Sequence, residues 1–172
     1  SLYGKTVFDI GLTGNGNIGI GTDVFNETTS GFSNVCIGMY SGYNLSTGNN
    51  NVFVGPSAGE HMETGTFNVC LGNQTGNGRN GTRNIFMGDR AGYAWNGTGN
   101  DNIMMGYYTG FKFNSTNSNN IFLGAYAGYD VNSSYNVFIG PYGTGRSAEG
   151  ENNIFLGRDV GQYFVGSDFL LI

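Results

Sequence analysis

The sequence Asn-Ile-Phe-Leu-Gly occupies residues 120–124, and the same five residues return at 153–157. Seven further segments share the pattern of Asn, apolar residue, variable residue, apolar residue and Gly. Successive copies begin 16 to 18 residues apart, and the nine leading residues are Asn17, Asn34, Asn51, Asn68, Asn84, Asn102, Asn120, Asn136 and Asn153. Nine copies at nearly constant spacing define a repeat protein, in which each copy is one structural unit that stacks on its neighbours.

Each copy predicts a short β-strand, because its apolar residues alternate. The second and fourth residues are always aliphatic or Met, and we expect them to be buried on one face. The closing Gly indicates a corner that needs a positive φ or a close backbone approach. We expect two or three short strands in each period of about 17 residues. The predicted fold is therefore all-β, a parallel β-solenoid or β-roll of nine rungs, roughly 40 Å long.

The leading asparagines also predict a ladder. Residues that recur at the same place in every rung stack about 4.8 Å apart in a parallel solenoid. Amide side chains at that spacing can hydrogen-bond from one rung to the next. We expect the nine asparagines given above to form such a ladder.

The middle residue of the repeat leads to a prediction about assembly. This position is apolar after the first copy, where it is Gly19: Cys36, Phe53, Cys70, Phe86, Met104, Phe122, Phe138 and Phe155. It lies on the opposite face of the strand from the second and fourth residues, so both faces are apolar. Strands of this kind lie between two layers, and we expect neighbouring chains to supply the second layer, in a homotrimer. The alternative is that these residues pack within the same chain.

The composition favours this fold over a disordered or helical chain. Of 172 residues, 32 are Gly, 24 are Asn and 15% are aromatic, whereas only 11% are charged. We divide the chain into a lead-in segment at 1–16, the repeats at 17–161 and an end or cap at 162–172, and we expect it to be part of a longer protein. The net charge is −5 and the basic residues are dispersed, which argues against nucleic-acid binding. No apolar run is long enough to insert into a membrane.

Motifs for catalysis are weak. The glycines at 14, 16 and 19 fit a dinucleotide-binding pattern, but a β-repeat follows where a helix is required. Cys36 and Cys70 lie two rungs apart, too far for a disulfide, and we expect free, buried thiols. Two cysteines and His61 cannot form a zinc site within one chain. The carboxylates are scattered, so we predict no enzyme activity, no catalytic residues, no metal and no cofactor.

Aromatic side chains after the strands form a candidate ligand surface. Rings interspersed with Asn, Ser and Thr suit sugars, because rings contact apolar C–H patches while polar groups bond hydroxyls. The alternative is that these rings wedge the corners of the solenoid or fill gaps between chains. The candidate glycan-contact residues are Tyr40, Tyr43, Tyr93, Trp95, Tyr108, Phe111, Tyr126 and Tyr129.

The repeats, from Gly-Asn-Ile-Gly-Ile-Gly-Thr at 16–22 onward, resemble those of bacteriophage tail fibres. They are also similar to the head repeats of trimeric autotransporter adhesins and to phage-like fibres of predatory bacteria. The likeness covers residues 16–161, although this repeat is longer than the adhesin unit and has Phe at its centre. The resemblance implies a homotrimer on a virion or cell surface that attaches to a glycan or another receptor of a host or prey cell. The alternative in the same setting is a polysaccharide-depolymerising tailspike, which needs two carboxylates in one cleft.

Overall fold

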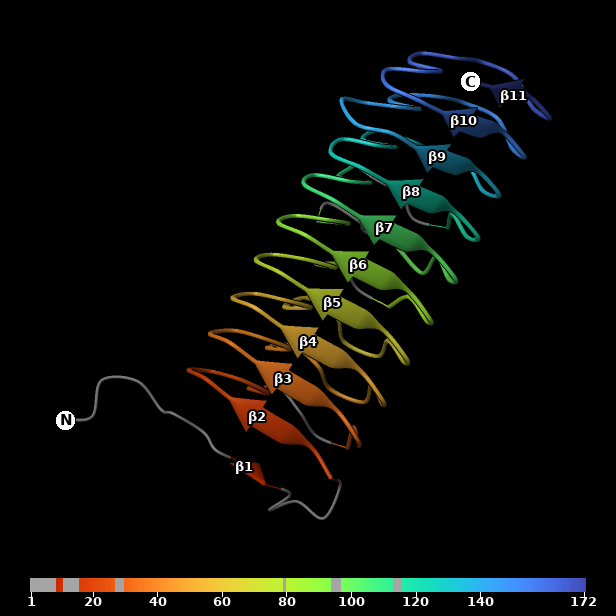
Figure 1. Cartoon of the computed structure of the whole chain (residues 1–172). Coiled ribbons are helices and arrows are strands. Elements are labelled where there is room, and N and C mark those ends of the chain that lie inside the picture. Colours follow the sequence, from red (N-terminus) through yellow and green to blue (C-terminus); the bar gives the residue numbers. More distant parts are fainter. Residues whose placement is uncertain (1–8, 11–15, 27–29, 79, 94–96, 113–115) are drawn as a thin grey trace.

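The computed structural model describes residues 9–10, 16–26, 30–78, 80–93, 97–112 and 116–172, and shows a rod built from one sheet (Figure 1). Eleven strands stack in chain order along the rod. They are β1 (Asp9–Ile10), β2 (Ile18–Ile20), β3 (Val35–Ile37), β4 (Val52–Val54), β5 (Val69–Leu71), β6 (Ile85–Met87), β7 (Ile103–Met105), β8 (Ile121–Leu123), β9 (Val137–Ile139), β10 (Ile154–Leu156) and β11 (Leu170–Leu171).

The strands pair in the register that the repeat predicts. Strands β2 to β11 are parallel, and equivalent positions face each other, as in the pair of Phe122 with Phe138. Strand β1 pairs antiparallel with β2 at the N-terminal end of the sheet. The nine repeats supply β2 to β10, and the chain forms a β-solenoid of about eight turns. The prediction of an all-β parallel solenoid is confirmed.

The number of strands in each turn differs from the expectation of two or three. Among the described residues, each turn has one strand, and isolated bridges pair Thr66 with Thr82 and Glu149 with Val165. Outside the strands, single backbone hydrogen bonds still join neighbouring rungs, as from the N–H of Gly42 to the carbonyl of Ala58 at 2.9 Å, and polar side chains supplement them. The backbone N–H of Thr82, for example, donates to Oδ1 of Asn100 at 2.8 Å in the next rung. Short polar side chains thus satisfy backbone groups that another strand would have paired.

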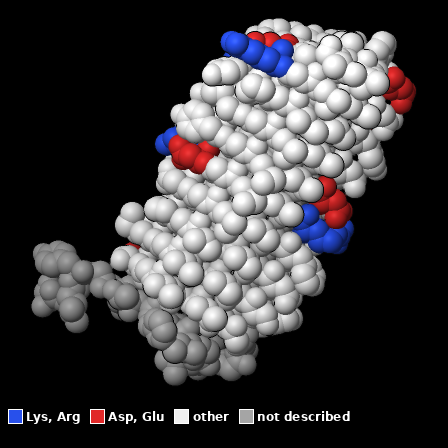
Figure 2. Space-filling model, viewed as in Figure 1, with Lys and Arg blue, Asp and Glu red and all other residues white. Residues whose placement is uncertain are grey.

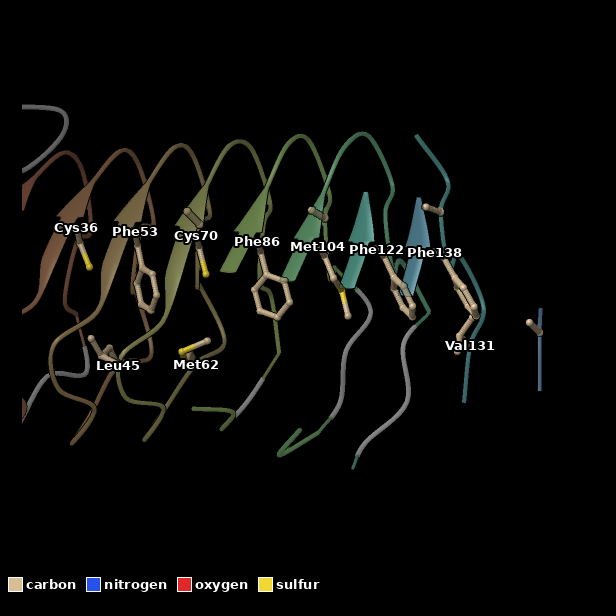
Figure 3. Close-up of a cluster of buried hydrophobic side chains, with 14 of the residues drawn as sticks. Cys36, Leu45, Phe53, Met62, Cys70, Phe86, Met104, Phe122, Val131 and Phe138 are labelled. Atoms are coloured by element: carbon tan, nitrogen blue, oxygen red, sulfur yellow. The ribbon is translucent and has the colours of Figure 1, made fainter. Parts of the chain in front are cut away.

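The middle residue of each strand lies inside the solenoid. Cys36, Phe53, Cys70, Phe86, Met104, Phe122, Phe138 and Phe155 are all fully buried within the single chain. Figure 3 shows this column extending from the strands toward Leu45, Met62 and Val131 on the opposite wall. The rings of Phe122 and Phe138 stack at 5.0 Å with 8° between their planes. The expectation that this column faces neighbouring chains is therefore wrong: it is the core of one chain, packed against its own turn segments.

The second and fourth residues point outward instead of inward, contrary to the prediction. Ile18 is 43% exposed, and Met105 and Ile139 are each 39% exposed. Glycines on the inner wall explain why the large middle residue fits inside. A Cβ at Gly128, where φ is +59°, would overlap the ring of Phe122. Sequence alternation predicts two faces but does not say which is interior, and the glycine opposite decides it.

The closing glycines form the first corner of each turn, as expected. All nine have positive φ, between 122° and 153°. At Gly55 a Cβ would lie 2.6 Å from the carbonyl carbon of Gly72 in the next rung. Only glycine permits this combination of dihedral angle and close stacking.

The asparagine ladder runs through the solenoid beside the strands. The backbone N–H of Asn34 donates to Oδ1 of Asn17 at 2.9 Å, and its amide donates to the carbonyl of Gly48 at 2.8 Å. The same bond, from the backbone N–H of one ladder asparagine to Oδ1 of the ladder asparagine before it, recurs up to Asn153. The Oδ1 of Asn153 in turn accepts the N–H of Phe169. The ladder members are buried, so each amide satisfies groups that water does not reach.

Replacing one ladder residue is expected to destabilise the solenoid. In Asn68→Ala the N–H of Asn84 and the carbonyl of Gly81 lose their side-chain partners. Each buried group left unpaired costs about 1–3 kcal/mol, so we expect a loss of about 3 kcal/mol in denaturant unfolding followed by circular dichroism. The control is Asn132→Ala at an exposed position, for which we expect a change below about 0.5 kcal/mol. Equal stability of the two variants contradicts a structural ladder.

Candidate assembly and contact surfaces

The outward side of the sheet is a continuous apolar surface, which we call the sheet face. It consists of the second and fourth residues of the nine repeats, and none of the eighteen is charged. Figure 2 shows the charged residues at the margins of the rod and an uncharged band along its middle. The eighteen residues are Ile18, Ile20, Val35, Ile37, Val52, Val54, Val69, Leu71, Ile85, Met87, Ile103, Met105, Ile121, Leu123, Val137, Ile139, Ile154 and Leu156.

The size and uniformity of the sheet face make it a candidate interaction surface. At about 4.8 Å per strand, two columns over nine strands cover on the order of 400 Å². Apolar patches of this size on a monomer are often functional. A strand with one face in water normally alternates apolar residues toward the core with polar residues toward water, whereas parallel sheets with two apolar faces are covered on both. One side of this sheet is covered by its own chain, and the sheet face is the side that remains.

Charged pairs lie beside the sheet face and not on it. On one margin Arg83 makes two hydrogen bonds to Asp101, at 2.6 and 2.8 Å, which lower the pKa of that carboxyl. On the other margin Arg90 contacts Asp89 at 3.3 Å. The first pair joins neighbouring rungs and the second joins consecutive residues. Neither pair places a charge on a strand.

Several candidate glycan-contact residues gather in one cluster, which we call the aromatic block. It contains Tyr93, Tyr107, Tyr108, Phe111, Tyr126 and Tyr129. Stacked rings at 5.4 Å and 5.2 Å link Tyr93 to Phe111 and Phe111 to Tyr129. The ring of Tyr108 stacks on that of Tyr126 at 5.6 Å. The block therefore follows the rod axis over three successive rungs.

The remaining candidates lie elsewhere. Tyr40 and Tyr43 contact each other edge to face at 5.6 Å and form a separate pair near β3. Trp95 lies outside the described residues. Sequence analysis missed Tyr107, which follows the closing glycine directly, at a position that is not aromatic in other copies. Its pKa is raised, mainly because neighbouring groups desolvate it and further because of Tyr126 and Tyr108.

Arginine side chains cover both ends of the aromatic block. The guanidinium of Arg90 lies 5.3 Å from the ring centre of Tyr108, and that of Arg146 lies 5.2 Å from the ring centre of Tyr129. Cation–π contacts of this kind are worth about 0.5–1 kcal/mol at exposed sites. Arg90 also donates to Gln74 at 2.8 Å. Within the described part of the chain, Arg146 makes no ion pair, so its N–H groups remain available as donors.

The two thiols are free and buried, as predicted. Burial raises the pKa of both Cys36 and Cys70 well above the ordinary value. Because the thiolate is the reactive form, we expect no alkylation of the native protein by iodoacetamide at pH 8 and complete alkylation in denaturant, as measured by intact mass. Rapid labelling of the native protein contradicts the packing of the core.

No metal centre or membrane helix is found in the part of the chain that the structure describes. Among these residues there is no group of three His, Cys, Asp or Glu side chains able to hold a metal ion. The same residues include no helix long and apolar enough to cross a bilayer. Comparison with models of known protein families, with curated proteins and with solved structures found no match to this chain.

Proposed function

We propose that this chain is a non-enzymatic structural and adhesive module of a homotrimeric fibre, displayed on a virion or on a bacterial surface. Three solenoids lie parallel, with their sheet faces toward a common axis. The rod sets the distance between the parts of the fibre that it joins, and its turn segments face outward to contact a glycan or another receptor of a host or prey cell.

The observation that carries the proposal is the uncharged sheet face. Its eighteen apolar residues project from one side of a solenoid whose other strand face is already filled. Exposed apolar area contributes roughly 25 cal/mol per Å² when it leaves water. Association of sister chains covers the whole length of the rod with one repeated contact, because each rung presents the same two positions.

Three chains are favoured over two by the layout of the sheet face and by the resemblance of the repeats to trimeric fibres. In a threefold ring each subunit contacts two neighbours through two different surfaces. The sheet face has two columns, so each column can pack against one neighbour. Parallel chains around one axis also keep the N-terminal ends together, as a fibre that extends from a particle requires.

The alternative is a tailspike that cleaves polysaccharide. The closest carboxylate pairs, Glu60 with Glu63 and Glu149 with Glu151, lie in turn segments, and the second pair is exposed. Incubation of the assembled protein with bacterial surface polysaccharides distinguishes the two functions. We expect binding, seen by co-sedimentation, without new reducing ends. Reducing ends that increase in proportion to the protein overturn the adhesive proposal in favour of hydrolysis.

A further inference from the structure

Two tyrosines of the aromatic block occupy an unfavourable backbone conformation. Tyr108 and Tyr126 have φ of 53° and 60°, in the left-handed region. Bulky residues are rare there, and residues held in such regions cost of order 1–3 kcal/mol each. Stacking between the rings offsets part of this cost. The same corner has a non-glycine residue with positive φ in every rung, from Asp23 to Asp159, so the conformation belongs to the turn, and what these two rungs add is the bulky ring placed on it.

The fold itself does not require rings at these positions. Ser57 and Gln74 occupy the equivalent corner two rungs and one rung before Arg90, with φ of 55° and 53°. Those rungs make the same turn and the same backbone bonds to their neighbours, such as the bond from Ser57 N–H to the carbonyl of Met39. The aromatic block is therefore an addition to part of the solenoid and not a condition for forming it.

The choice of ring also indicates a surface that contacts a ligand. Five of the eight apolar side chains in the middle column of the core are Phe, whereas five of the six rings in the block are Tyr. A buried stack needs no hydroxyl, but a half-exposed one uses it to bond a partner. Tyrosine and arginine are enriched at the hot spots of protein–protein interfaces, and the same combination of rigid area with hydrogen-bond donors suits a polar ligand.

We infer that the aromatic block binds a short segment of glycan lying along the rod axis. This inference rests on the proposed adhesive function and assigns it a site. The ring faces are occupied by neighbouring rings, so the contacts come from ring edges, from tyrosine hydroxyls and from the N–H groups of Arg146. These groups match a ligand with apolar C–H patches and closely spaced hydroxyl or acidic oxygens.

A glycan fits the block better than a protein partner does. Three rungs at about 4.8 Å span roughly 10–15 Å of the rod. A stable protein interface needs about 800 Å² on each side, several times what three rungs of one corner present. A few sugar residues, in contrast, are covered by a site of this length, and their repeat runs parallel to the repeat of the rings.

The test uses substitutions that the chain already tolerates. The double variant Tyr108→Ser and Tyr126→Ser places serine where Ser57 stands in an equivalent corner with the same φ. The matched control is Tyr135→Ser, because Tyr135 is 54% exposed at the corner that precedes β9, with φ of 62°, and Ser33 occupies the equivalent place with φ of 56°. All three proteins are applied to arrays of microbial polysaccharides and of mammalian glycans, and their melting temperatures and solution masses are measured.

We expect the wild type and Tyr135→Ser to retain the same glycans, and the double variant to lose at least tenfold in binding with unchanged mass and a similar melting temperature. The inference is overturned if no glycan on either array is held more strongly by the wild type than by the double variant. It is also overturned if the double variant changes mass, since the block then serves assembly. A monomeric wild type that binds glycan through the block removes the trimer proposal and leaves this site in place.

Discussion

Phe122→Ala is expected to destabilise the solenoid by about 3–5 kcal/mol, the usual cost of removing a buried phenylalanine ring. Its ring is fully buried, stacks on Phe138 and packs under Gly128 of the opposite wall. Deleting it leaves a cavity that cannot close, because the backbone on both sides is fixed by the strands and by the asparagine ladder. Denaturant unfolding followed by circular dichroism at fixed protein concentration measures the loss.

The control for this prediction is Phe67→Ala, at a ring that is 57% exposed, for which we expect a change within about 0.5 kcal/mol. The two variants lose the same atoms, so their difference isolates burial. If Phe122→Ala keeps the stability of the wild type while its solution mass falls, the middle column lies between chains and its place in the core is wrong.

Two lysines on the sheet face are expected to separate the chains without unfolding them. Met105→Lys with Ile139→Lys places two charges on the fourth-residue column, at positions that are each 39% exposed in one chain. Within an assembly these positions lose contact with water, and an unpaired buried charge costs several kcal/mol. We expect a folded monomer of 18.3 kDa, with the circular dichroism spectrum of the wild type, as measured by light scattering after gel filtration.

The control adds the same charges elsewhere. Thr98→Lys with Asn132→Lys alters two exposed residues in the turn segment that precedes the strands, and we expect the oligomer to persist. A sheet-face variant that keeps the mass of the wild type shows that another surface holds the chains together. A variant that unfolds is distinguished from one that dissociates by its spectrum.

The period, the strand positions and the asparagine ladder could be predicted from the sequence because each depends only on which residues recur. Nine copies of one pattern fix the register of β2 to β10, and an Asn side chain joins two rungs at each step. The positive φ of the closing glycines, as at Gly55, follows from the same recurrence.

The alternation alone could not predict which face of each strand lies inside the solenoid. A strand with apolar residues at all three positions looks the same from either side, and Phe86 between Ile85 and Met87 gives no sign of which is interior. The inner wall supplies that information: Gly92 packs on the ring of Phe86, where a Cβ would lie 2.9 Å from the ring. The glycine eight residues after the asparagine is thus the signal that would have identified the core.

The aromatic surface was predicted in part, for a similar reason. Tyr93, Phe111 and Tyr129 were among the candidates and lie together, because equal offsets in successive copies become neighbours along the rod. Tyr107 occurs once at its offset, so no recurrence marks it, and only the structure places it against Tyr108 and Tyr126.

The mass of the unmodified protein in solution bears most directly on whether sister chains cover the sheet face. Light scattering over a range of concentrations is expected to give three times the 18.3 kDa of one chain. A single, well-folded species of 18.3 kDa at every concentration, soluble with its eighteen apolar side chains in water, contradicts the account.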